Sequence, residues 1–187
     1  EGRGNREDYE GWARAGCSGW GYADLLPWFR KAEDQQHGAN EFHGAGGPLT
    51  VSGPAYRHPL ADAFIAGAVE LGHPANTDFN GASQDGAGYF QYTIRNGRRA
   101  SPATAYLRPA RSRRNLRVVT QALAQRVSFD GMRASGVEYA QGGRQHHAHA
   151  RREVVLCGGT FNSPQLLQLS GIGPGALLQR LGIAVRR

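Results

Sequence analysis

The sequence has few of the residues that would fix a disulfide-stabilised or membrane-embedded fold. Its 187 residues include two cysteines, and Cys17 and Cys157 belong to no CxxC or Cys/His metal-ligand spacing. This pattern excludes a disulfide scaffold. A reducing compartment is therefore expected, which makes the cytoplasm the expected location. No apolar run approaches the ~20 residues of a membrane-spanning helix.

Methionine is also scarce. Met132 is the only methionine, and the chain begins at Glu1. We therefore expect the natural start of the protein to lie upstream, so that any targeting signal would precede this sequence. Residues 182–187 have the composition of a strand that is beginning. Together these features predict an internal fragment, with the size of one domain or part of one.

Lysine is nearly absent, although the chain is basic. The formal net charge is +7, and of the 22 lysine and arginine residues only Lys31 is lysine. A nucleic-acid site needs its positive charge gathered on one face or in one segment. Here the arginines are scattered among acidic residues and glycines. We expect no nucleic-acid partner, and a basic binding module remains an alternative.

Apolar periodicity and turn residues predict a mixed α and β fold. Hydrophobic residues make up 40% of the chain, which is typical of globular proteins, and 27 glycines indicate many turns. Helices are predicted over residues 22–34, 60–71, 101–107, 163–169 and 174–181. Strands are predicted over residues 49–51, 116–120, 125–129, 134–139 and 153–156. Hairpin-type turns at residues 130–131 and 142–143 predict an antiparallel meander.

Metal-ligand side chains do not form a recognisable site in the sequence. His147 and His149 would share one face of a strand beside His146, but no carboxylate or cysteine lies at ligand spacing. A solvated hairpin strand is the preferred interpretation. The loop holding Asp78 and Asn80 lacks the full ligand series of a calcium loop, so we interpret both as turn caps. No bound metal is expected.

Other polar and aromatic residues have ordinary structural interpretations. No Gly-x-Ser-x-Gly motif supports a serine hydrolase. His43 stands beside a glycine, where a loop role is commoner than catalysis. Tyr89, Phe90 and Tyr92 either line a substrate site or form a packed aromatic strand, and we favour the strand.

The segment around residues 158–171 has the strongest functional pattern. An apolar strand would end in Gly158 and Gly159, where no Cβ blocks the approach of a ligand. Ser163 is expected to cap the next helix with Pro164 at its first position, and Gly171 to end it. A strand end followed by a helix N-terminus suits a nucleotide. From these residues alone, an ordinary strand–turn–helix unit remains an alternative.

This segment resembles the second signature of the glucose–methanol–choline (GMC) oxidoreductases. Every constrained position of the signature is met between Gly159 and Gly173, including the closing Ser-Gly-aliphatic-Gly of residues 170–173. Among the members of the family, the sequence resembles the choline-dehydrogenase-like ones. Further segments that resemble the family are residues 3–12, 24–33, 43–49, 78–81, 97–101, 105–107 and 115–116.

The resemblance implies an α/β fold of mixed α+β character. The chain would then contain part of an FAD-binding Rossmann-like domain, which carries an antiparallel β-meander. It would also contain part of the substrate-side domain. Residues 1–37 would form an extension and helix of the FAD domain, and residues 38–100 a substrate-side or interface segment. Residues 101–187 would form the FAD-binding portion with the meander and the second signature.

The resemblance also implies FAD as the cofactor and indicates four residues of its site. In the family, a backbone group of the meander strand after a Thr-x-Ala sequence meets the adenine, and residues 120–122 place Ala124 there. Cys157, Gly158 and Gly159 match the small residues that line the adenosine part of the site. Core packing is the alternative role for these three residues.

The whole protein is expected to oxidise a small-molecule alcohol by hydride transfer to FAD. The resemblance places the dinucleotide-binding GxGxxG upstream of this sequence and the catalytic histidine downstream, so no catalytic residue is expected within it. The isolated chain is therefore expected to be inactive. A non-catalytic truncated product without flavin is the main alternative. The oligomeric state stays open.

Overall fold

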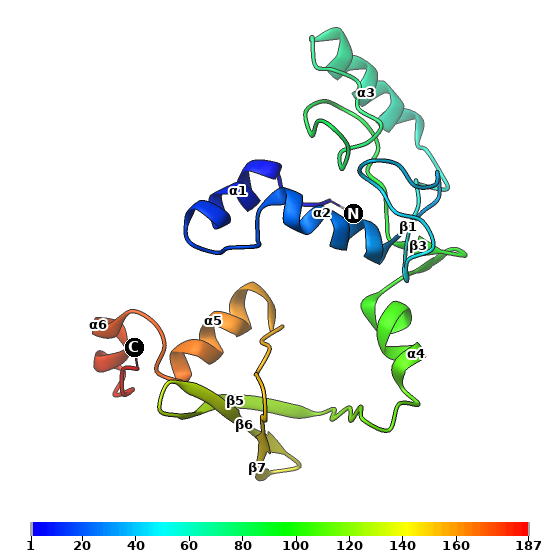
Figure 1. Ribbon diagram of the computed structural model, residues 1–187. Coiled ribbons are helices and arrows are strands. Elements are labelled where there is room, and N and C mark those ends of the chain that lie inside the picture. Colours follow the sequence, from blue (N-terminus) through cyan, green and yellow to red (C-terminus); the bar gives the residue numbers. More distant parts are fainter. Residues whose placement is uncertain (1, 187) are drawn as a thin grey trace. The chain divides into compact units, whose positions relative to one another are not determined.

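The computed structural model describes residues 2–186, which divide into two compact units (Figure 1). Unit 1 is Glu1–Leu116 and unit 2 is Arg117–Arg187. The boundary at residue 116 separates two parts that are each compact. The expected division into residues 1–37, 38–100 and 101–187 concerns the functional role of each segment, and it stays a prediction. No helix within residues 2–186 is long and apolar enough to cross a membrane.

Unit 1 is built mainly from helices joined by long loops. Its helices are α1 (Arg6–Arg14), α2 (Tyr22–Ala32), α3 (Pro59–Glu70), the π-helical turn η1 (Ala103–Leu107) and its continuation α4 (Arg108–Ala110). Asn5 caps α1 by accepting the N–H of Glu7, and Asp8 completes a capping box. The α3 helix matches its predicted range to within a residue, and it begins where His58 Nδ1 accepts the N–H of Leu60.

The α2 helix begins at Tyr22, as predicted. Gly21 occupies the N-cap position, and Asp24 Oδ2 accepts the Gly21 N–H at 3.2 Å from inside the first turn. Pro27 consequently lies within the helix, where it removes one intrahelical hydrogen bond. The helix ends at Ala32, before the predicted residue 34, because Glu33 is already extended and enters a strand.

Short strand pairs connect the loops of unit 1. The predicted strand at residues 49–51 is confirmed as β2 (Leu49–Val51), and it pairs in parallel with β1 (Glu33–Gln35). A second pair is antiparallel, β3 (Ile94–Arg95) with β4 (Arg98–Arg99). Asn96 and Gly97 between them have φ values of 50° and 69°, as a tight hairpin requires.

The aromatic residues 89–92 do not form the strand that we favoured. Tyr92 alone makes an isolated bridge, with Ser52. The Tyr89 hydroxyl donates to Asp62 at 2.9 Å, and desolvation together with this bond raises the pKa of Tyr89. The Phe90 ring packs against Phe79 with centroids 4.8 Å apart, so each of the three aromatic residues makes a separate local contact.

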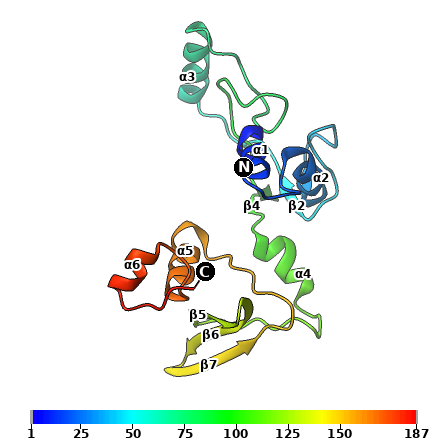
Figure 2. The ribbon, with the colours of Figure 1, turned by 60° about the vertical axis from the view of Figure 1, so that its left-hand side comes forward.

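Unit 2 contains the predicted antiparallel meander (Figure 2). Its strands follow one another in the order β5 (Ala122–Asp130), β6 (Arg133–Gln141) and β7 (Arg144–His149). Gly131, Gly142 and Gly143 adopt the left-handed conformation at the two turns. Every residue of β7 is exposed, which confirms a solvated strand for the three histidines.

Two helices follow the meander, α5 (Gly159–Leu169) and α6 (Gly175–Arg180). The Ser170 hydroxyl joins α5 to β5, because it accepts the buried Val127 N–H at 2.8 Å and donates to the Leu166 carbonyl. Leu178 of α6 is completely buried, and Gly171 ends α5 with a φ of 90°, as predicted.

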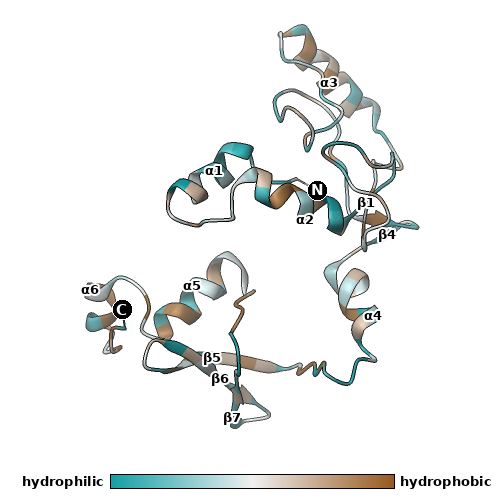
Figure 3. Cartoon of the chain, viewed as in Figure 1, coloured by the Kyte–Doolittle hydropathy of each residue, from teal (hydrophilic) through white to brown (hydrophobic). Residues whose placement is uncertain are grey.

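The predicted strands at residues 116–120 and 153–156 are absent. Both segments are mainly aliphatic (Figure 3), and Val118 and Val155 are 49% and 72% exposed. A strand needs a hydrogen-bonded neighbour, and within residues 2–186 no strand pairs with either segment. Residues 182–186 likewise lie outside any strand, and residue 187 is outside the described residues.

The α5 helix begins earlier than predicted. Gly158 is its N-cap, so Ser163 does not cap the helix and Pro164 does not occupy its first position. Ser163 instead accepts the Gly158 N–H at 2.9 Å from within the helix. The left-handed φ of 80° at Gly159 turns the chain into the helix, and this turn places the start ahead of the serine.

Candidate functional site

A cavity of about 400 Å³ lies beside α5 in unit 2. Of the four predicted cofactor-binding residues, Ala124, Cys157 and Gly158 line it, although Ala124 is more than thirty residues from the other two. The remaining walls are mainly aliphatic and come from β5, β6, residues 154–156 and α5. We call this space the α5 cavity. The structure thus brings three of the four predicted residues around one concave surface.

Gly159, the fourth predicted residue, follows directly at the first position of α5. A Cβ on Gly159 would meet no atom within 4 Å, so its left-handed φ is the reason for glycine there. At Gly158 a Cβ would lie 3.0 Å from the Asn162 Cβ. At the edge of the cavity, Gly159 therefore allows a sharp turn, and Gly158 allows close contact with the helix.

Ala124 lies where β5 departs from regular pairing. It pairs with Tyr139, and the next pair is Arg126 with Glu138, so Gln125 is an extra residue on β5. Such a bulge leaves one residue outside the regular ladder and bends the strand, and bulges are frequent beside functional sites. The bulge therefore interrupts the backbone ladder at the point where Ala124 lines the α5 cavity.

The α5 cavity fits the adenosine part of a dinucleotide in size and chemistry. Ligand cavities typically measure about 300–1,000 Å³ and have mainly apolar walls with a few polar groups. Here the aliphatic side chains would contact a flat base, and the amides at the start of α5 lack intrahelical acceptors. Asn162 and Gln165 add side-chain amides to the lining.

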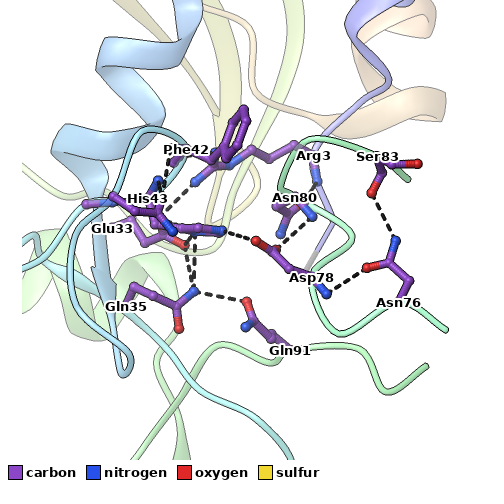
Figure 4. Close-up of polar contacts among 12 residues, drawn as sticks. Arg3, Glu33, Gln35, Phe42, His43, Asn76, Asp78, Asn80, Ser83 and Gln91 are labelled. Atoms are coloured by element: carbon purple, nitrogen blue, oxygen red, sulfur yellow. Dashed lines mark hydrogen bonds and ion pairs between the residues drawn. The ribbon is translucent and has the colours of Figure 1, made fainter. Parts of the chain in front are cut away.

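A second polar site lies in unit 1, where three buried charged or titratable side chains meet the half-buried Asp78 (Figure 4). Glu33 Oε2 receives a hydrogen bond from Arg3 Nη2 at 2.9 Å and lies 3.0 Å from His43 Nδ1. His43 Nε2 lies 2.9 Å from Asp78 Oδ2, and the exposed fraction of His43 is 2%. We call Arg3, Glu33, His43 and Asp78 the buried ion network.

The geometry of this network favours a structural role for His43. Both ring nitrogens face carboxylate oxygens, and Gln35 Nε2 lies 3.3 Å from Nδ1. Neither nitrogen is therefore open to a substrate proton, which agrees with the predicted loop role. The Asp78 side chain accepts the Asn80 N–H, which confirms Asp78 as a turn cap. The Asn80 side chain instead accepts the distant Arg3 N–H, so the predicted turn-cap role of Asn80 is wrong.

Sequence reasoning missed the network because its members are far apart along the chain. A signal was nevertheless present, since Arg3, Glu33, His43 and Asp78 each belong to a segment that resembles the GMC family. Within residues 2–186, no group of three or more His, Cys, Asp or Glu side chains is placed to hold a metal ion.

Comparison with known protein families shows which family this chain belongs to. The GMC oxidoreductase family matches residues 2–182, which is nearly the whole chain. The chain belongs to the GMC oxidoreductase family. The resemblance inferred from the signature is thereby confirmed, and so is the mixed α/β fold class.

Curated relatives of this GMC chain include choline dehydrogenases. The mitochondrial choline dehydrogenase of Homo sapiens is 50% identical over 183 residues, covering 98% of this chain and 31% of the relative. The oxygen-dependent choline dehydrogenase of Yersinia pseudotuberculosis is 50% identical over 186 residues, covering 97% and 33%. The chain thus spans about a third of the length of the curated relatives it matches.

Solved structures agree with this assignment. The pyridoxine 4-oxidase from Mesorbium loti superposes with a TM-score of 0.88 at 35% identity, covering 99% of this GMC chain and 37% of that protein. An FAD-dependent oxidoreductase from Chaetomium thermophilum superposes with a TM-score of 0.84 at 30% identity, covering 98% and 34%. Together with the family match, these neighbours imply a flavin cofactor.

Proposed function

We propose that this chain is part of an FAD-dependent oxidoreductase that acts on the CH–OH group of a small alcohol. The supporting observation is the GMC match over residues 2–182, together with choline dehydrogenases at about 50% identity. Bound FAD would supply the redox chemistry by accepting a hydride from the alcohol. Choline or a related amino alcohol is the proposed substrate, on the strength of those relatives.

The proposed role of unit 2 is to hold the adenosine part of FAD in the α5 cavity. Leu123, Val137 and Leu166 would contact the faces of the base. The Ala124 backbone would meet its polar edge at the bulge of β5, as the family resemblance implies. Gly158 and Gly159 would let the cofactor approach the start of α5 without a side chain in the way. Cys157 lies between these elements and completes the wall.

The proposed role of unit 1 is to support the substrate side of the same enzyme. The buried ion network fixes the loops at residues 36–48 and 73–88 relative to Arg3 and β1. Rigid support of such loops lowers the entropic cost of positioning a substrate. No residue in either unit is proposed to take the hydroxyl proton of the alcohol.

The test of this function uses the longest reading frame that contains the chain. The purified protein would be mixed anaerobically with choline while its visible flavin absorbance is recorded. Loss of the oxidised flavin band on adding choline, with no change on adding trimethylamine, is the expected result. A flavin-loaded protein that no alcohol reduces would contradict the proposed function.

The non-catalytic alternative is tested by comparing the 187-residue chain alone with the longest reading frame. Because neither a GxGxxG phosphate-binding loop nor the proposed proton acceptor lies in these residues, the chain should retain no flavin after incubation with FAD and desalting. Retention of FAD by the chain alone would mean that residues interpreted as scaffold bind the cofactor. The same experiment on the longest reading frame would separate a truncated product from a complete enzyme.

A further inference from the structure

The arginines of unit 1 divide into two groups along the sequence. In residues 2–94 every arginine has a carboxylate, carbonyl or aromatic partner; these residues are Arg3, Arg6, Arg14, Arg30 and Arg57. By contrast, residues 86–129 contain no aspartate or glutamate. Arg126 of that segment pairs with Glu138 in unit 2. The arginines of the segment that belong to unit 1 have no aspartate or glutamate beside them in the sequence.

Four of these arginines surround one cavity. Arg95 on β3, Arg98 and Arg99 on β4, and Arg108 at the start of α4 line a cavity of about 600 Å³ together with Thr104. The β3–β4 hairpin forms one side of this cavity and the helical segment η1–α4 forms another. We call this space the arginine cavity. It lies entirely within unit 1.

None of these four guanidinium groups has a protein partner within residues 2–186. No ion pair, hydrogen bond or aromatic contact engages Arg95, Arg98, Arg99 or Arg108, and no acidic side chain lines the cavity. All four arginines are exposed, so water weakens their mutual repulsion, and a bound anion would be attracted to all of them at once. The charge that the sequence showed as scattered is therefore concentrated here by the hairpin and the helix.

We propose that the arginine cavity binds a small phosphate-bearing polyanion. Arginine presents a planar, permanently charged fork that matches phosphate oxygens through two parallel hydrogen bonds. A diphosphate group carries several negative charges, which suits four guanidinium groups better than a single carboxylate does. The cavity volume accommodates a nucleotide-sized molecule. The lining residues of this cavity belong to unit 1, whereas those of the α5 cavity belong to unit 2.

The test is a calorimetric titration of the full 187-residue chain with inorganic pyrophosphate at low salt. Arg98→Gln/Arg99→Gln removes two charges from the cavity. The matched control Arg113→Gln/Arg114→Gln removes two charges from the same acid-free segment but not from the cavity lining. We expect the cavity variant to bind pyrophosphate roughly tenfold more weakly or worse, and the control to bind within about threefold of the parent.

A second pair of variants tests the cavity without changing the β3–β4 hairpin, whose folding the first pair could disturb. Arg108→Gln changes the helical wall, and Arg111→Gln is its control one turn later. Far-ultraviolet circular dichroism identifies variants that keep the parent fold. A parallel titration with a nucleoside diphosphate distinguishes the source of the phosphate, since tighter binding than pyrophosphate would identify a nucleotide, and equal binding the phosphates alone.

Equal weakening in the cavity and control variants would show only general attraction to a basic chain, and it would overturn the proposal. Absence of pyrophosphate binding by the folded parent chain would overturn it as well. Because FAD is not part of the titration, neither result depends on whether the proposed flavin enzyme is correct.

Discussion

Unit 1 encloses charged and polar side chains, whereas unit 2 encloses mainly aliphatic ones. Beside Tyr9, Val51 and Ala100, unit 1 buries the polar or charged residues Glu33, Gln35, His43 and Asn80. The buried side chains of unit 2 include Val127 and Leu178, with Ser170 as the buried polar one. A buried ion network destabilises the fold severely when one partner is removed, because the other charges remain buried. An aliphatic contact loses only the transfer and cavity energies of the atoms removed. The two units should therefore respond differently to single substitutions.

The largest effect is expected for Glu33→Gln in unit 1. This change removes the carboxylate that contacts both Arg3 and His43 and accepts the Gly44 N–H. We expect a loss of about 3–5 kcal/mol in the free energy of unfolding, measured by urea denaturation. The control Glu7→Gln breaks only the exposed pair with Arg14 and should cost about 0–1 kcal/mol. Similar losses in both variants would contradict a special role for the buried ion network.

A smaller effect is expected for Leu178→Ala in unit 2. Leu178 is completely buried, so its truncation should cost about 2–3 kcal/mol in the same urea experiment. The matched change Leu181→Ala alters a side chain that is 62% exposed and should cost under about 1 kcal/mol. If the two leucine variants unfolded at the same urea concentration, α6 would not pack as the structure shows.

The next smaller loss of stability is expected for Ser170→Ala in unit 2. It leaves the buried Val127 N–H without an acceptor, which should cost about 1–3 kcal/mol. In the control Ser163→Ala, the freed Gly158 N–H is exposed and can bind water, so the loss should be smaller. Hydrogen exchange of the Val127 amide provides the local measurement, and unchanged protection in Ser170→Ala would exclude this bond as the link between α5 and β5.

The smallest effect concerns the exposed pair of Arg126 and Glu138 in unit 2. The hydrogen bond from Arg126 lowers the pKa of Glu138 below 4.5. Its contribution to stability is therefore complete above pH 4.5 and disappears as the pH falls through the lowered pKa. A weak loss of thermal stability in this acid range should be absent in Arg126→Gln and reduced by salt. Identical acid profiles for both proteins at low salt would show that the pair contributes nothing.

Local features of the fold could be predicted from the sequence, and features that depend on partners could not. The meander was predictable because Gly131, Gly142 and Gly143 mark its turns. The strands expected at residues 116–120 and 153–156 depend on a neighbouring strand, and apolar composition alone does not supply one. The start of α5 was misplaced because Ser163 and Pro164 form a typical helix start, while the left-handed Gly159 begins the helix earlier.

The functional sites also include residues that could be predicted from the sequence and residues that could not. Ala124, Cys157 and Gly158 were predicted through the family resemblance, and the structure gathers them around the α5 cavity. The buried ion network and the arginine cavity were not predicted, because each joins residues from separate segments. Scattered arginines in a sequence can therefore converge when a two-residue hairpin and a helix face one another.

Equilibrium binding of FAD tests the central claim that the α5 cavity holds the cofactor. In the longest reading frame containing the chain, Cys157→Phe places a ring in the cavity, whereas Cys17→Phe changes the other exposed cysteine, which lies in unit 1. Quenching of flavin fluorescence gives the dissociation constant of each variant. We predict roughly tenfold weaker FAD binding, or worse, for Cys157→Phe, and unchanged binding for Cys17→Phe. Equal affinity in the parent and both variants would contradict the proposed site.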